Sequence, residues 1–322
     1  MSSSVLTAPA QPQERRISKP WLDGDQVSHL VTMLFAASVF AVTVFLVYEL
    51  WIHSAASRAK FGWSFLWEQT WDPVAIKFGA LPFIYGTVLT SVLALLISIP
   101  LGVGAAIFLA ELAPPRFSNA CTFLVELLAA VPSVILGLLA IFSLVPIMRQ
   151  YIEPFLKKTL GGLPLFQGPA YGVGYLTAGV ILSIMTFPFI ISISREALLA
   201  VPREQREAAL ALGATKWEST WQVVVPFARL GIIGSIFLAL ARALGETMAV
   251  TMVIGNDTSI HTSLLAPGYT IAAIIANEFT EATGDVYLSS LVELGLVLFA
   301  VTMVLNASAQ LLIIATTRRG SK

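Results

Sequence analysis

Charged side chains are scarce in this sequence, and so are the residues that build disulfides and metal sites. Only 12% of its 322 residues are Asp, Glu, Lys or Arg, about half the share found in soluble domains. The 19 basic and 19 acidic residues cancel, which argues against a nucleic-acid-binding protein. The single cysteine, Cys121, excludes an intramolecular disulfide and a multi-cysteine metal centre. The three histidines lie far apart, so we expect no metal site.

A phosphate-binding loop is also missing. The pattern G-x-x-x-x-G-K-S/T requires a lysine directly after a glycine, and no Gly-Lys pair occurs in the chain. No nucleophile or acid–base set recurs at one depth of the apolar segments. We therefore predict that the chain has no catalytic residues, is not an enzyme and binds no cofactor of its own.

Long apolar runs are what the sequence does contain. Hydrophobic residues make up 57% of the chain, and its mean hydropathy is +0.82. A helix that crosses a bilayer needs about 20 predominantly apolar residues, and the alternating polarity of barrel strands is absent. We therefore predict an all-α membrane protein with six transmembrane helices, at residues 30–52, 83–111, 120–147, 172–194, 230–254 and 287–315.

The basic residues give these spans an orientation. If the N-terminus lies in the cytoplasm, twelve Lys and Arg residues fall in inside segments and six in outside segments. This bias fits the positive-inside rule, so we expect both termini in the cytoplasm. The first apolar run, about 23 residues long, exceeds a signal-peptide core, which favours an uncleaved anchor over a signal peptide. The expected parts are a disordered cytoplasmic tail (1–28), the first span with an external segment (29–82), the main transmembrane domain (83–316) and a cytoplasmic tail (317–322).

An aromatic stripe is expected in the external segment. Trp63, Trp67 and Trp71 recur at a spacing of four, which places them on one face of a helix. This pattern indicates an interfacial helix anchored at the lipid headgroups or a docking surface for an external partner.

The loop between the fourth and fifth spans, about residues 195–229, has a pattern too ordered for a mere connector. Pro202 suits the first turn of a helix, and the helix formers after it stop at Gly213, a residue typical of helix C-termini. Thr215 and Glu218 then form a T-x-x-E capping box for a second, amphipathic helix. The sequence therefore predicts two helices joined by a glycine turn at the membrane surface.

This loop resembles the EAA loop of ABC importer permeases. That pattern is Glu-Ala-Ala, three residues, Gly, nine residues, then Ile-x-Leu-Pro, and the two departures here are Val223 and Val225, which stay apolar. The resemblance implies a loop that couples to a separate ATPase through Glu207, Ala208, Ala209, Gly213, Trp217 and Pro226. The alternative is an interfacial hairpin without a partner.

Two charges interrupt the fifth predicted span. On a helix covering 230–254, Arg242 lies roughly 18 Å from either end, near the bilayer midplane, where an arginine costs about 2.5–3.5 kcal/mol. A helical wheel places Ser235, Arg242 and Glu246 in one sector about 80° wide, opposite bulky apolar residues. We predict that this face, with Thr247 beside it, lines a cavity and forms the substrate pathway.

A transport role for these charges competes with a structural ion pair between Arg242 and Glu246. An arginine that precedes its glutamate is the weaker i,i+4 order, and buried pairs add little stability, so we favour transport. The forked donors of Arg242 suit an oxyanion such as phosphate or sulfate. Glu246 is predicted to accept a hydrogen bond from the proton of hydrogen phosphate, which sulfate lacks.

Three stretches extend the resemblance over the chain from about residue 28 onward. "PFIYGTVLTSVLALLISIPLGVGAAIFLAE" (82–111), "ELLAAVPSVILGL" (126–138) and "RALGETMAVTMVIGN" (242–256) are similar to the PstC-type phosphate permeases of the type I ABC importer family. The resemblance implies a type I permease fold in the bacterial inner membrane, surrounded by lipid, with Arg242 and Glu246 taking part in phosphate translocation. It also implies a PstA-type sister permease, a PstB-type ATPase dimer that holds ATP and Mg, and an external phosphate-binding protein, PstS.

Other classes of transport protein remain open at this point. One alternative is a permease for another oxyanion such as sulfate. Another is a secondary anion transporter that uses Arg242 and Glu246 as a coupled pair, which would give no reason for the EAA-like spacing. A membrane enzyme would need a reactive set of side chains that the sequence does not offer.

Overall fold

The computed structural model describes residues 24–319, with side chains for residues 26–311. The chain divides into two compact units, residues 1–49 and 50–322. The described part of the first unit is most of α1 (Gly24–His53), whose last residues belong to the second unit. Of the expected 1–28 tail, residues 1–23 lie outside the described residues, and α1 already begins at Gly24. Residues 320–322 of the expected C-terminal tail also lie outside them.

Six helical segments of the described chain are long and apolar enough to cross a membrane. They cover residues 26–53, 81–112, 133–160, 175–199, 216–245 and 285–311. Their number confirms the predicted all-helical, six-span fold, and all six bounds shift; the largest shifts are in the third span, which begins at 133 rather than 120, and the fifth, which begins at 216 rather than 230.

The centre of the second unit is the pair α3 (Leu81–Ile107) and α8 (Tyr175–Leu199), which pack against each other. Glycine makes this contact close: a Cβ added at Gly102 of α3 would lie only 2.8 Å from Ile190 of α8. A Cβ added at Gly179 of α8 would likewise lie only 2.7 Å from the Leu93 side chain of α3. Small residues let transmembrane helices approach until their backbones nearly touch, so these glycines set the spacing at the core.

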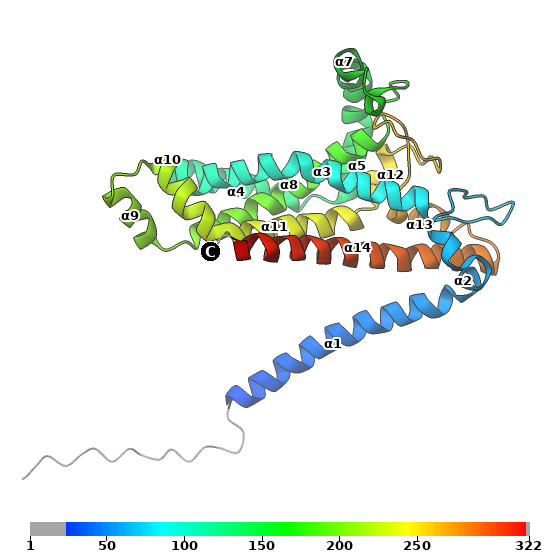
Figure 1. Ribbon diagram of the computed structural model, residues 1–322, viewed down its shortest axis with the longest axis horizontal. Coiled ribbons are helices and arrows are strands. Elements are labelled where there is room, and N and C mark those ends of the chain that lie inside the picture. Colours follow the sequence, from blue (N-terminus) through cyan, green and yellow to red (C-terminus); the bar gives the residue numbers. More distant parts are fainter. Residues whose placement is uncertain (1–23, 320–322) are drawn as a thin grey trace, which may run out of the picture. The chain divides into compact units, whose positions relative to one another are not determined.

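Further long helices of the second unit run alongside this pair (Figure 1). α11 (Val225–Gly245) packs on both α3 and α8, and α14 (Asp285–Arg319) packs on α11. α9 (Arg203–Ala211) and α10 (Lys216–Ser219) lie at one end of this unit, which we call the loop end, and α2 (Ala55–Phe61) and α13 (Ile271–Glu278) lie at the opposite, far end.

The third span is broken where the sequence predicted one helix over 120–147. α4 (Pro115–Ala129) stops before Pro132, and a new helical segment starts with α5 (Ser133–Leu139). Proline disfavours a helical conformation in the residue before it, so the apolar run continues while the helix does not. The second segment continues through η3 (Ala140–Leu144), α6 (Val145–Ile147), η4 (Met148–Ile152) and α7 (Glu153–Leu160).

The predicted tryptophan stripe is wrong. α2 passes into η1 (Gly62–Leu66), which ends before the third tryptophan. Trp63 and Trp67 are exposed, whereas Trp71 is buried and its Nε1 donates a hydrogen bond of 2.8 Å to Glu278 at the end of α13. Its ring also packs edge-on against Phe78 and Phe83, so one tryptophan of the three belongs to the core of the far end.

Replacing Trp71 tests this placement. Trp71→Ala removes a buried ring and leaves the Glu278 carboxylate without its indole donor, so we expect a loss of about 3–5 kcal/mol of stability. The measurement is the temperature at which the detergent-solubilised protein loses its monodisperse peak in size-exclusion chromatography. Trp67→Ala is the matched control and should stay within about 0.5 kcal/mol of the parent. Equal losses in both variants would contradict the placement.

Candidate functional site

The 195–229 loop folds as the capping signals predicted. α9 (Arg203–Ala211) is followed by Gly213 with φ of +90°, a left-handed conformation that favours glycine. α10 (Lys216–Ser219) begins with the full capping box: Thr215 Oγ1 accepts from the Glu218 amide at 3.3 Å, and Glu218 Oε2 accepts from the Thr215 amide at 2.8 Å. The two-helix prediction is therefore confirmed.

The second helix of this loop does not end at the membrane surface. It continues through the π-helical turn η6 (Thr220–Val224) into α11, with Pro226 in the first turn of α11. The fifth span therefore covers residues 216–245, and its predicted start at 230 is wrong. Pro226 follows the π-helical turn directly, so its missing N–H falls where the helical hydrogen-bond ladder already changes register and the segment is not interrupted. The loop helix and the span thus form one continuous helical segment.

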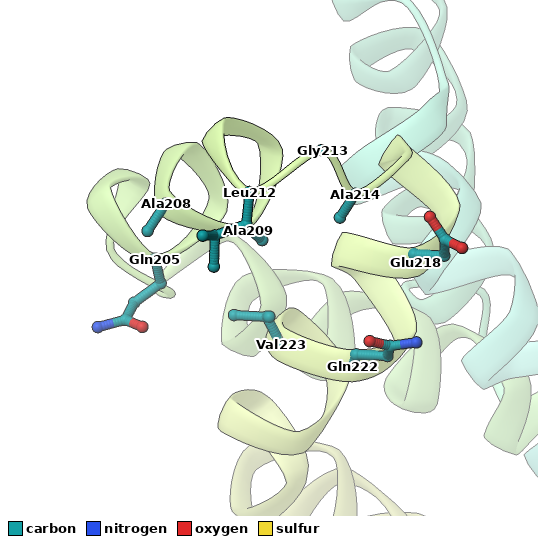
Figure 2. Close-up of a pocket in the computed structure, with 9 residues that line it drawn as sticks. All are labelled: Gln205, Ala208, Ala209, Leu212, Gly213, Ala214, Glu218, Gln222 and Val223. Atoms are coloured by element: carbon teal, nitrogen blue, oxygen red, sulfur yellow. The ribbon is translucent and has the colours of Figure 1, made fainter.

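An open recess of about 560 Å³ lies between α9 and the helical turns of α10 and η6 (Figure 2). Its lining is small or uncharged apart from one glutamate: Gln205, Ala208, Ala209, Leu212, Gly213, Ala214, Glu218, Gln222 and Val223. Glu207 and Trp217 are exposed on the same loop, and the Trp217 ring packs on Trp221 at 5.6 Å. The short side chains of the two alanines leave room for another surface to enter.

The helix around Arg242 is shorter than the wheel assumed, so the continuous helix over 230–254 is wrong. α11 ends at Gly245, Glu246 is extended (φ −72°, ψ 126°), and α12 (Met248–Val253) follows as a separate helix. Arg242 therefore lies in the last turn of α11. Arg229 is the last charged residue before Arg242 on α11, and by helix rise the two lie about 20 Å apart along the axis. A hydrocarbon core of about 30 Å that begins near Arg229 therefore contains Arg242. Unwound backbone at such depth must be covered by protein or line water.

Arg242 and Glu246 do not form the structural ion pair that the sequence left open. Between the described side chains, no ion pair within 4.0 Å joins them. The guanidinium of Arg242 instead lies 4.9 Å from the ring of Phe189 on α8, in cation–π geometry. Glu246 is buried, and its Oε1 accepts a long hydrogen bond of 3.4 Å from the Ala249 amide. Each charge is thus held by its own neighbours, and Thr247 between the two helices is half-buried.

Ser235 lies apart from these residues. It is fully buried, and its hydroxyl forms a 2.8 Å hydrogen bond with Ser194 of α8. Ala239, one turn further on, is also fully buried. The structure thus uses the small-residue face of α11 for packing on α8 rather than for lining a cavity within this chain, and a pathway role for Ser235 stays a prediction.

An arrangement of six membrane-crossing helices with an ordered two-helix loop before the fifth is the fold of type I ABC importer permeases. A chain of a crystal structure of a bacterial alginate ABC transporter, solved with its alginate-bound periplasmic protein, aligns with a TM-score of 0.58. The alignment covers 88% of this chain and 93% of that chain at 14% identity, a likeness of fold alone.

The chain belongs to the family of binding-protein-dependent transport system inner membrane components, whose sequence model matches residues 98–319. It is similar to the phosphate transport system permease protein PstC of Mesorhizobium japonicum, with 47% identity over 92% of this chain and 91% of that one. It is also similar to PstC of Xylella fastidiosa, with 46% identity over 91% of this chain and 93% of that one. The chain is therefore a multi-pass inner-membrane protein.

The conformation of the loop depends on Gly213, which gives a direct test. A Cβ at this position meets nothing within 4 Å, so Gly213→Ala adds only the cost of a left-handed backbone, about 1–2 kcal/mol. We expect faster amide hydrogen exchange across α9 and α10. Gly162→Ala is the control, because that glycine also has open space but no positive φ. Unchanged exchange in Gly213→Ala would show that the turn does not hold the loop.

Proposed function

We propose that this chain is the membrane-spanning permease subunit of an ATP-driven importer of inorganic phosphate. It forms half of the translocation pathway in the bacterial inner membrane, with both termini in the cytoplasm. A PstA-type permease supplies the other half, and a PstB-type ATPase dimer binds ATP and Mg. An external phosphate-binding protein, PstS, delivers the anion. The chain itself is a transport subunit without enzymatic activity.

One observation carries the proposal: the loop with EAA spacing runs without a break into the helix that holds Arg242. The recess between α9 and α10 offers a site for a neighbouring subunit: Ala208 and Ala209 line it, and Glu207, next to them in the sequence, is exposed. A push on this loop therefore reaches the charged end of α11 through continuous helix. A secondary transporter would leave the recess and its EAA spacing without a role.

The pathway chemistry rests on two residues with different tasks. Arg242 attracts the anion, because its guanidinium is always charged and the contact described for it is with an aromatic ring rather than a carboxylate. Glu246 uses Oε1 on the Ala249 amide, and among the described residues Oε2 has no hydrogen-bond donor. This second oxygen accepts the proton of hydrogen phosphate. ATP binding and hydrolysis then open the pathway alternately to the outside and the inside.

Association of the permease with the ATPase tests whether the loop couples the two proteins. Glu207→Lys reverses an exposed charge, and Gly213→Trp places a bulky ring in the turn beside the recess, so both should weaken retention of the ATPase about tenfold or more, which is about 1.4 kcal/mol. The measurement is copurification of the ATPase with the tagged permease. Arg203→Ala, an exposed change on the same helix, is the control. Undiminished retention in both loop variants would refute coupling through this loop.

The preference of the transporter for phosphate over sulfate tests the role proposed for Glu246. Glu246→Gln removes the charged acceptor while keeping the size of the side chain, so the preference for phosphate over sulfate should fall roughly 10-fold to 100-fold. The measurement is uptake of labelled phosphate by cells in the presence of competing sulfate. Glu204→Gln on α9 is the control, because it makes the same change at an exposed site. Unchanged selectivity in Glu246→Gln would show that this carboxylate does not contact the substrate.

A further inference from the structure

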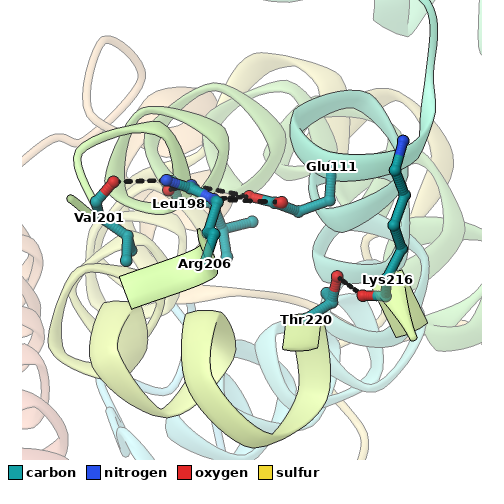
Figure 3. A network of polar contacts seen from close by, with 6 residues as sticks. All are labelled: Glu111, Leu198, Val201, Arg206, Lys216 and Thr220. Carbon is teal, nitrogen blue, oxygen red and sulfur yellow. Dashed lines mark hydrogen bonds and ion pairs between the residues drawn. The ribbon is translucent and has the colours of Figure 1, made fainter. Parts of the chain in front are cut away.

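Arg206 connects the surface helix α9 to two membrane-spanning helices at once (Figure 3). Its Nη2 donates to Glu111 Oε1 at 2.8 Å and to the Leu198 carbonyl at 2.7 Å. Its Nε donates to both oxygens of Glu111 at 3.2 and 3.3 Å, and its Nη1 donates to the Val201 carbonyl. One guanidinium thus engages a carboxylate and two backbone carbonyls.

The two sides of this contact belong to the central helix pair. Glu111 lies in the π-helical turn η2 (Phe108–Leu112) that ends α3, and Leu198 lies in the last turn of α8. The side chains are mostly buried, with 20% of Arg206 and 12% of Glu111 exposed. A forked guanidinium on a carboxylate in such surroundings is among the stronger and more directional polar contacts in proteins.

Apolar packing beneath this pair joins the same elements. Ile107 of α3, Leu198 of α8 and Val224 of η6 belong to one buried cluster at the loop end. This cluster holds the ends of α3, α8 and α11 together, but no residue of α9 belongs to its buried part. For α9, the polar contact through Arg206 is therefore a direct side-chain link to α3 and α8, while its backbone also lies close to η6 at the start of the fifth span.

Without that link, α9 would be held by its proximity to η6 and by two points where the backbone changes direction. One is Pro202 before its first turn, and the other is Gly213 after its last. A helix held in this way can rotate about both ends. Force applied to α9 would then bend the loop instead of moving the spans.

We propose that the Arg206–Glu111 contact transmits the movement of α9 to α3 and α8, as a positioning contact for transport that rests on the proposed function. α8 carries Phe189 and α11 carries Arg242 opposite it. The contact drives the α8 side, while the continuous helix from α10 drives the α11 side. The two helices that meet at Arg242 and Phe189 therefore shift together when α9 moves.

The test uses the whole transporter, reconstituted in lipid vesicles with the ATPase, the sister permease and the external binding protein. Arg206→Lys keeps the charge and loses the fork, and Glu111→Gln keeps the shape and loses the charge. Both should retain the ATPase and continue to hydrolyse ATP, while the phosphate transported per ATP falls by a factor of about 3 to 30. Arg203→Lys, an exposed change on the same helix, should leave this ratio unchanged.

An exchange of the two charges adds a second, independent measurement. The double variant Arg206→Glu with Glu111→Arg restores an ion pair at the same place, so its transport per ATP should exceed that of the Arg206→Glu single variant. An unchanged ratio in Arg206→Lys and Glu111→Gln, with the ATPase retained, would overturn the proposal. Failure of the parent chain itself to retain an ATPase would instead overturn the proposed function.

Discussion

The absence of water inside a bilayer is the constraint on which this structure depends. Every backbone amide and carbonyl at that depth needs a partner within the protein, so spanning segments are helical and departures from helix are confined to protected places. The break between α11 and α12 is such a departure, since Glu246 is buried and extended there. The chain also breaks between α4 and α5, at Pro132, which is exposed on this chain. Both breaks lie in segments that hydropathy presents as single spans.

Local chemistry explains which parts of the fold could be predicted from the sequence. Hydropathy predicts six spans because each needs a run of apolar residues, whatever its neighbours are. The turn at Gly213 and the cap formed by Thr215 and Glu218 were predictable because these residues act on their own backbone. The EAA spacing was equally predictable, because it lies within one short stretch of sequence, residues 207–226.

What the sequence could not supply depends on contacts between distant segments. Trp71 follows the same four-residue spacing as Trp63 and Trp67, and only its partner Glu278, far along the chain, places it in the core. Ser235 fits a pathway face on a wheel, but Ser194 on α8 engages it. The end of α11 at Gly245 has one local signal, the glycine itself, and many transmembrane glycines serve packing instead. The sequence therefore identifies Arg242 and Glu246 as charges inside a span, but it does not predict that each contacts different neighbours.

Glu278 has a consequence for the far end of the molecule. Its Oε2 accepts both the indole N–H of Trp71 at 2.8 Å and the hydroxyl of Tyr287 at 2.6 Å. These donors come from the segment before α3 and from the first turn of α14, so one oxygen atom joins α13 to both of these stretches. A single carboxylate therefore braces the far end, and its loss would release Trp71 and Tyr287 from α13 together.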